Sequence, residues 1–285
     1  MKNILMIILV IFASCALKKT KKGNKSENLK VMTYNIRLDV ASDGENSWAN
    51  RSNFLLSQIK FYEPTVFGIQ EGRPNQIEDT TNGLPNYSFI GHGRDGGNDG
   101  EYSAIFYDKR KVKFSKVNTF WLSETPEKLS KGWDAAYPRI CTYGLMTVLN
   151  SDKKVWIFNT HLDHVGQQAQ LNGMKLIEAK IKKVNTKNYP VIITGDFNVE
   201  PESKLISILK NNFSDAKELA GKNAFGVNGT FNGFKFHEPV TRRIDYIMLS
   251  KNTSVAVKKY AVLTDSKDLK YPSDHFPVFA EIQLK

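Results

Sequence analysis

The sequence is poor in the residues that cross-link chains or build zinc clusters. Its 285 residues include only two cysteines, at positions 15 and 141. Cys141 lies in the apolar stretch 140–149, so we expect a small buried core residue rather than a reactive thiol. Of the five histidines, His161 and His164 have a spacing that zinc sites use. No cysteine lies nearby and no third histidine follows at ligand spacing, which disfavours zinc.

The sequence also lacks an apolar run of transmembrane length near its start. Residues 4–12 are apolar, but roughly ten such residues are too few for a bilayer that needs about 20. Lys2 before this run and Ala13-Ser14-Cys15 after it are typical of a bacterial export signal. The small residues before Cys15 resemble a lipoprotein lipobox, although Phe12 stands where leucine is usual. We therefore expect residues 1–15 to be an export signal ending at a lipidated Cys15, which would leave no partner for a disulfide. Ordinary secretion or an uncleaved anchor is the alternative.

Most of the positive charge lies near the N-terminus. The formal net charge is +11, but residues 1–30 hold seven lysines and one glutamate, which leaves 33 basic minus 28 acidic residues, or +5. Residues 16–28 have almost nothing to bury and are predicted to be a disordered tether. The remaining domain, 29–285, is mildly basic. This suits an anionic substrate but is too weak to imply nucleic acid, and a solvated lysine-rich surface explains it equally well.

Hydropathy patterns predict many strands and few helices in one domain without internal repeats. The longest helices lie between strands, which favours two packed sheets covered by helices. Two long polar or glycine-rich loops, 91–100 and 221–241, are expected to face a substrate. Strands are predicted at 30–36, 65–70, 87–90, 103–107, 112–120, 142–149, 155–160, 191–194, 244–249, 255–262 and 278–284, and helices at 50–61, 166–184 and 202–209.

Acid and amide side chains follow two of these strands directly. Glu71 ends the apolar strand 66–70, and a carboxylate at a strand end is a hard oxygen ligand that suits Mg²⁺. Asp196 and Asn198 follow residues 191–195, and strand alternation places both on one side with Phe197 in the core. Aspartate can take a proton from water while the amide holds a phosphoryl oxygen. The alternative is that both residues merely cap the helix after Pro201.

Two histidines also lie next to the ends of predicted strands. His161 ends the strand 155–160, and His275 follows Asp274 just before the last strand. Histidine is the usual proton carrier near neutral pH, although a lone histidine is more often a packed or surface residue. Phosphate ester hydrolysis needs groups that neutralise the phosphoryl oxygens, aim a water and manage protons. The segments together supply these groups.

Six short motifs in a fixed order resemble the endonuclease/exonuclease/phosphatase superfamily. They are Thr33-Tyr34-Asn35-Ile36-Arg37, Gln70-Glu71, Asn159-Thr160-His161-Leu162-Asp163, Gly195-Asp196-Phe197-Asn198, Arg243-Ile244-Asp245-Tyr246 and Ser273-Asp274-His275. The resemblance covers the chain from Leu29 to the C-terminus. It implies a four-layer α/β sandwich, with two packed, mostly antiparallel sheets flanked by helices and the site at the top of the sheets. It also implies Mg²⁺ or Mn²⁺ held by Asn35 and Glu71, with Asp274 as a further ligand or a support.

The resemblance assigns further roles residue by residue. Asp196 and Asn198 match the pair that orients water and phosphate. Asp245 matches the carboxylate that hydrogen-bonds His275, and Glu101 matches the glutamate that orients His161. Which histidine acts as acid and which as base stays open. Arg139 occupies a position where relatives often contact phosphate, the alternative being a surface ion pair.

The substrate is less defined than the chemistry. No insertions of an abasic-site enzyme, no basic aromatic track and no apolar membrane hairpin are visible. Trp121 is expected to form a wall of the site and Phe120 to lie in the core. Arg94 belongs to a segment that resembles a bacterial branch with poorly defined substrates, and is a candidate substrate ligand.

We therefore expect an exported cell-envelope lipoprotein, on the periplasmic or cell-surface side and monomeric, that hydrolyses phosphate esters, diesters more than monoesters. A secreted nuclease acting on DNA or RNA and a non-catalytic phospho-ligand binding protein are the alternatives.

Overall fold

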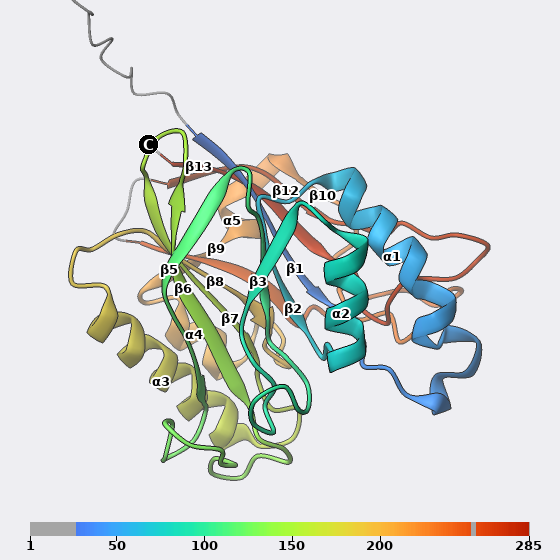
Figure 1. Cartoon of the computed structure of the whole chain (residues 1–285), viewed down its shortest axis with the longest axis horizontal. Helices are drawn as coiled ribbons and strands as arrows, with labels where there is room; N and C mark the ends of the chain where they lie inside the picture. Colours follow the sequence, from blue (N-terminus) through green and yellow to red (C-terminus); the bar gives the residue numbers. More distant parts are fainter. Residues whose placement is uncertain (1–26, 252–254, 285) are drawn as a thin grey trace, which may run out of the picture.

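The computed structural model describes residues 27–251 and 255–284 as two sheets packed face to face, with helices on both outer faces (Figure 1). The predicted export signal, Cys15 and most of the predicted tether lie outside the described residues. The first strand begins at Glu27, two residues before the boundary expected at residue 29. Within the described ranges, no helix is both long enough and apolar enough to cross a membrane.

The first sheet has seven strands in the order β10-β12-β13-β1-β2-β4-β3. β1 lies near its centre, parallel to β2 and antiparallel to β13. Helices α1 (Trp48–Tyr62) and α2 (Pro74–Gly83) cover its outer face, where Leu55, Ile59 and Ile77 pack against Met32 and Phe67. The strands are β1 (Glu27–Asn35), β2 (Val66–Gln70), β3 (Tyr87–Ile90), β4 (Ile105–Asp108), β10 (Ala224–Phe225), β12 (Val255–Val262) and β13 (Val278–Leu284).

The second sheet has six strands in the order β5-β6-β7-β8-β11-β9. Helices α3 (Gln167–Val184) and α4 (Lys204–Leu209) pack on its outer face through Ile177 and Ile206. The short α5 (Ala216–Ala220) instead contributes to the core between the sheets. The strands are β5 (Val112–Trp121), β6 (Ile140–Val148), β7 (Lys154–His161), β8 (Val191–Asp196), β9 (Phe213–Asp215) and β11 (Asp245–Ser250). Two short 3₁₀ turns, η1 (Ala41–Asn46) and η2 (Gly221–Asn223), complete the described elements.

A buried polar cluster joins the two sheets just below the site. The Asn159 side chain of β7 donates to the carbonyl oxygens of Ile69 (2.8 Å) and Ala104 (3.0 Å) in the other sheet. Its Oδ1 accepts from Gln70 Nε2 at 2.7 Å. Gly68 lies against this amide, and a Cβ at that position would overlap the Asn159 side chain. The cluster therefore fixes the end of β2, and with it Glu71, against β7.

The predicted fold class is confirmed, and every predicted strand and helix has a counterpart with ends shifted by a few residues. Cys141 is buried and free, and Phe120 is buried, as expected. The sequence patterns missed α2, because Ile77 is the only large apolar residue in that helix and gives no periodicity. They also missed β9, α5 and β10, which are too short to show a period.

Candidate active site

A cavity of about 580 Å³ opens where β1, β2, β7 and β8 end, so both sheets contribute to it. The two predicted loops also reach it, through Arg94 and Phe231. Of the residues predicted for the site, the cavity is lined by Glu71, Arg94, Glu101, Arg139, His161, Asp196, Asn198, Asp274 and His275.

Glu71 and Asn35 face each other at the ends of the parallel strands β2 and β1. Asn35 Nδ2 donates to Glu71 Oε1 at 2.9 Å and to Asp196 Oδ2 at 3.0 Å, which links the two sheets. Leu38 N–H donates to the other Glu71 oxygen at 3.0 Å. Glu71 has a φ of 63°, a left-handed conformation that costs a non-glycine residue energy and that concentrates at functional sites. The chain thus holds this carboxylate in a fixed, strained position.

Asp196, the last residue of β8, lies between the two histidines. Its Oδ2 is 3.4 Å from His161 Nε2 and 3.8 Å from His275 Nε2. Asn198 folds back with a φ of 53°, so that its N–H donates to Asp196 Oδ1 at 2.9 Å. The Asn198 amide also lies 3.0 Å from His161 Nε2. The alternative of a helix cap is wrong, because Ser203 caps α4.

The predicted pair of His275 and Asp245 is present. His275 Nδ1 lies 2.9 Å from Asp245 Oδ2, and both residues are buried. Burial alone would lower the pKa of His275, but Asp245, Asp274 and Asp196 outweigh it and raise the pKa to about 10. For His161, burial is again the largest effect, and the cations Arg139 and Arg94 add to it, so its pKa lies well below the usual value. Near neutral pH, His275 is therefore charged and His161 is neutral.

The carboxylates of the cavity crowd one another. Burial, and then the charge of Asp245, raises the pKa of Asp196 to about 7. Burial and the charge of Glu71 raise the pKa of Asp274 to about 6 against the opposing effect of His275. A divalent cation between such groups would favour their ionised forms, because its charge replaces the protons.

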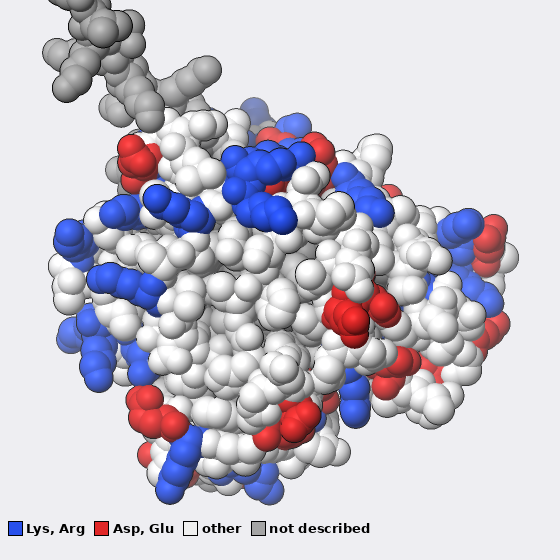
Figure 2. Space-filling view, in the orientation of Figure 1, with Lys and Arg blue, Asp and Glu red and all other residues white. Residues whose placement is uncertain are grey.

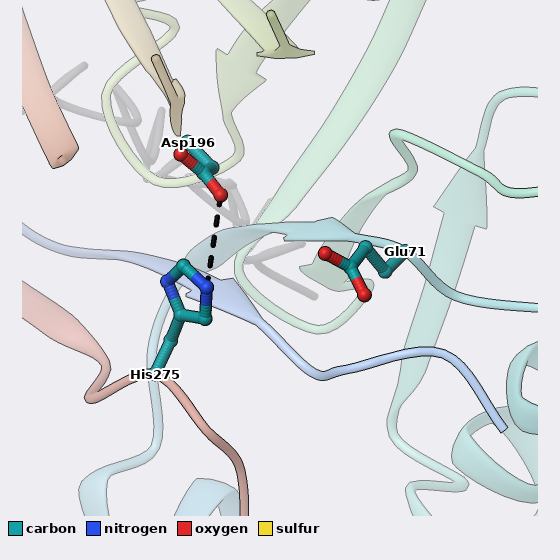
Figure 3. Close-up of side chains that lie close together, drawn as sticks. All are labelled: Glu71, Asp196 and His275. Atoms are coloured by element: carbon teal, nitrogen blue, oxygen red, sulfur yellow. Dashed lines mark ion pairs between the residues drawn. The ribbon is translucent and has the colours of Figure 1, made fainter. Parts of the chain in front are cut away.

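The donor set fits a divalent cation. Ligand atoms of Glu71, Asp196 and His275 all lie within 4.8 Å of one another (Figure 3). Figure 3 shows the three side chains converging from β2, β8 and the loop before β13. The carboxylate oxygens of Glu71 and Asp196 suit Mg²⁺ or Mn²⁺, whereas the His275 nitrogen could bind a cation only after losing its proton. His164 Nδ1 lies 3.1 Å from Arg139 Nη2, and His164 is not one of the three residues of this group.

The two other predicted metal ligands, Asn35 and Asp274, do not belong to this three-residue group. Asn35 presents its nitrogen, not its oxygen, to the two carboxylates, because its Oδ1 accepts from Arg37 N–H at 3.0 Å. Asp274 lines the cavity outside the three-residue group, with Oδ2 3.9 Å from Arg37 Nη1. In this arrangement both residues support the ligand group rather than complete it.

The expected hydrogen bond between Glu101 and His161 is not formed. Glu101 instead pairs with Arg94 through two contacts of 2.7 and 2.8 Å. His161 Nδ1 is buried and has no hydrogen-bond partner, and neither has Arg94 Nε. A strongly basic guanidinium is a better partner for a buried carboxylate than a neutral imidazole, which explains why Glu101 pairs with Arg94 and not with His161.

Of the two predicted substrate ligands Arg139 and Trp121, Arg139 lines the cavity and Trp121 does not. Arg139 lines the cavity, and its Nε lies 3.2 Å from Asp163 Oδ2 in a buried ion pair, so the alternative of a surface ion pair is wrong, whereas its contact with phosphate stays a prediction. Trp121 is not among the residues that line the cavity. Its Nε1 donates to the Arg94 carbonyl oxygen at 2.7 Å, so it supports the Arg94 loop instead of forming a wall.

Several residues of the cavity were missed from the sequence. Phe231 packs edge-on against His275, with ring centroids 5.0 Å apart, and Arg242 lies 5.4 Å over its ring. Tyr137 carries Arg94 over its face at 5.1 Å. Arg37 belongs to the first of the six motifs and could have been named from it, whereas Arg73, Tyr137 and Arg242 follow no pattern. The cavity thus holds five arginines: Arg37, Arg73, Arg94, Arg139 and Arg242.

A family model described as the Endonuclease/Exonuclease/phosphatase family matches residues 32–275, which include every motif around this cavity. The chain belongs to this family. A solved family member from Bacteroides thetaiotaomicron is 36% identical, with 92% of this chain and 96% of that chain covered and a TM-score of 0.86. A mannosyl-6-phosphatase from the same organism is 37% identical, with 89% and 99% covered and a TM-score of 0.83.

A more distant solved structure shows the fold alone, and one further relative matches by its sequence. TDP2 from D. rerio, solved with a single-stranded DNA product, is 20% identical, with 90% of this chain and 99% of that chain covered and a TM-score of 0.70. An uncharacterized protein of Acanthamoeba polyphaga mimivirus is 30% identical over 176 residues, 59% of this chain. The matched region spans 65% of that viral relative.

Proposed function

We propose that this protein is a phosphatase that uses Mg²⁺ or Mn²⁺ to remove phosphate from a phosphorylated sugar. The observation that carries the hydrolytic chemistry is the position of Asp196 between His161 and His275, within ligand distance of Glu71. Glu71 and Asp196 would hold the cation, while His275, which is charged near neutral pH, would face the phosphoryl group beside it. When bound, it would act as a Lewis acid on the phosphoryl group and neutralise its charge.

The chain's own residues divide the remaining work. Asn198 fixes Asp196 through its N–H, so that Asp196 can orient the attacking water and accept its proton. A bound cation would lower the pKa of Asp196 from about 7, so that its carboxylate is ionised and able to accept a proton near neutral pH. His275, held by Asp245, donates a hydrogen bond and positive charge to the phosphoryl oxygens as charge develops on them. The leaving alcohol oxygen must gain a proton, and the neutral His161, with Nε2 3.4 Å from Asp196 Oδ2, would relay to it the proton taken from water.

The arginines favour a phosphate monoester over a diester. A monoester near neutral pH carries up to two negative charges and a diester only one. Five arginines and four carboxylates line one cavity of about 580 Å³, and the excess positive charge, increased by a bound divalent cation, would suit the more highly charged group. The relative that is 37% identical over nearly its whole length acts, by its name, on a mannosyl 6-phosphate. The sequence alone favoured diesters, and these remain the second candidate because the family also contains nucleases.

The test measures phosphate release from mannose 6-phosphate, glucose 6-phosphate and p-nitrophenyl phosphate. Bis-p-nitrophenyl phosphate and single-stranded DNA are assayed in parallel, each with Mg²⁺, Mn²⁺ or chelator. We expect a hexose 6-phosphate to be the best substrate and Asp196→Asn to be inactive. Preference for the diester or for DNA would replace the sugar phosphate with the second candidate. Absence of turnover on the whole panel, with phosphate esters still bound, would indicate a binding protein.

A further inference from the structure

Two aromatic side chains line the cavity and take no part in the hydrolytic chemistry proposed above. Tyr137, just before β6, and His164, just after β7, line it together with Asp196 and His275. Tyr137 is 51% exposed, and His164 is exposed as well. The two rings lie nearly parallel, with centroids 6.0 Å apart and an angle of 16° between their planes. We call Tyr137 and His164 the aromatic shelf.

The backbone that carries the aromatic shelf is fixed although both side chains are exposed. The buried Asp163 carboxylate joins the segment before β6 to the segment after β7. It accepts from the backbone N–H groups of Ala136, Tyr137, Val165 and Gly166, at 2.8 to 3.4 Å. Ordering a loop when a ligand binds costs free energy, and a loop that is already ordered avoids much of that cost. The shelf is therefore preorganised to bind a ligand.

Arg139 fixes the hydrogen-bonding role of His164. Arg139 Nη2 lies 3.1 Å from His164 Nδ1. A guanidinium group can only donate hydrogen bonds, so Nδ1 must accept and the ring hydrogen lies on Nε2. The nitrogen of His164 that is left for a ligand is therefore a hydrogen-bond donor.

The arginines beside the aromatic shelf are balanced by carboxylates. Arg94 lies over the Tyr137 ring at 5.1 Å, and its guanidinium is 2.7 Å from Glu101. Arg139 Nε lies 3.2 Å from Asp163 Oδ2. Because each of these guanidinium groups has its own carboxylate, they add little net charge beside the shelf. This part of the cavity suits an uncharged group better than a second phosphate.

The distribution of surface charge favours a compact leaving group. On the face drawn in Figure 2, Lys and Arg gather mainly toward the end where β1 starts. Charges of both signs mix at the opposite end, where the loops around the cavity lie (Figures 1 and 2). A nucleic acid chain is held through its phosphates by a basic patch or stripe. This face therefore favours a small ester over a long polyanion.

We propose that the aromatic shelf binds the ring of the leaving hexose when its 6-phosphate lies at Asp196 and His275. Tyr137 contacts the apolar C–H face of the sugar, and His164 Nε2–H donates to one of its hydroxyl oxygens. Aromatic area with a few placed polar groups is usual for small-ligand sites, and the cavity of about 580 Å³ is large enough for such a ligand. This inference rests on the proposed sugar phosphatase activity and makes Tyr137 and His164 its specificity-determining residues.

The test compares kcat and KM for mannose 6-phosphate with those for glycerol 2-phosphate, which has no ring. Tyr137→Ala should raise KM for the hexose phosphate roughly ten-fold and leave kcat almost unchanged, because the lost contact is equal in the ground and transition states. The loss should be several times smaller for glycerol 2-phosphate. Tyr137→Phe keeps the ring and should retain the KM of the wild type. Val165→Ala is the matched control, since Val165 is 62% exposed on the same segment and does not line the cavity.

His164→Ala removes the donor and should raise KM for the hexose phosphate by roughly three- to ten-fold, the contribution of one hydrogen bond. Unchanged KM values for mannose 6-phosphate in Tyr137→Ala and His164→Ala would overturn the inference and leave the proposed function standing. Equal losses on both substrates would also overturn it, because they would mean that the substitutions disturb the whole cavity. A wild type that hydrolyses diesters but no hexose phosphate would instead refute the proposed function, and the inference with it.

Discussion

Replacing Asp163 with asparagine tests how one wall of the cavity is held together. The Asp163 carboxylate is buried, with an exposed fraction of 1%, at the point where β7 has ended and α3 has not begun. It binds Arg139 and joins the segment before β6 to the segment before α3. Its donors are the backbone N–H groups of Ala136, Tyr137, Val165 and Gly166, at 2.8 to 3.4 Å, and Arg139 Nε at 3.2 Å.

The contribution of Asp163 to the free energy of unfolding follows from the pKa of its carboxyl group. Burial alone would raise the pKa of Asp163, but the N–H donors and Arg139 outweigh it and lower the pKa from 3.8 to about 2. A depressed carboxylate pKa stabilises the folded state above the unfolded pKa, and that contribution is lost as the pH falls from about 4 to about 2. The full shift corresponds to about 2 kcal/mol, which screening by solvent at the cavity reduces to roughly 1 to 2 kcal/mol.

The assay is urea unfolding of the wild type and Asp163→Asn from pH 7 down to pH 2. We expect the variant to be less stable at pH 7, and the difference in unfolding free energy to shrink by that 1 to 2 kcal/mol as Asp163 protonates in the wild type. Asp152→Asn, at an exposed turn, serves as the control and should show neither effect. A stability difference that stays constant over the whole pH range would refute the argument, since it would show that the charge of Asp163 contributes nothing.

Three further outcomes are expected. Asp196→Asn should lower kcat by about 10³-fold or more without lowering the urea midpoint, because it removes a buried charge as well as the base. Chelation should abolish phosphate release, Mg²⁺ or Mn²⁺ should restore it, and Glu71→Gln should need more metal; activity unaffected by chelator would exclude the proposed cation. Gly68→Ala should cost about 3 kcal/mol or more in thermal unfolding, because its Cβ would displace the buried Asn159 amide. A melting temperature within a degree of the wild type would show that the two sheets can move apart there.

The sequence predicted what depends on local pattern. Strand β8 is a short apolar run with Asp196 at its end, so both its burial and the exposure of the carboxylate to the cavity could be foreseen. The pairing of His275 with Asp245 was available only through the family resemblance, since the two residues are 30 positions apart. Helix α2 could not be seen by periodicity, although Pro74 at its first turn is a start signal that was open to use.

Local sequence pattern could not show which charged residues pair with each other. Glu101 had two possible partners near the cavity, and a sequence motif cannot show that the Arg94 guanidinium lies closer than the His161 ring. The same holds for Trp121, whose ring was expected at the site and whose Nε1 instead binds the backbone of the Arg94 loop. Such choices depend on where loops of ten residues or more come to rest, which the sequence around each residue does not fix.

The distribution of the site over the two sheets explains why its geometry depends on the core beneath it. Asn35 and Glu71 come from the seven-stranded sheet, and His161 and Asp196 from the six-stranded sheet. Neither sheet alone holds the cation ligands together with the histidines. At the site, the hydrogen bond of Asn35 to Asp196 joins the two sheets. In the interior just below the site, the Asn159 amide joins them again. A change in sheet separation would therefore move Glu71 relative to Asp196 before it disturbed either half, so the interior polar cluster positions the catalytic groups as well as stabilising the fold.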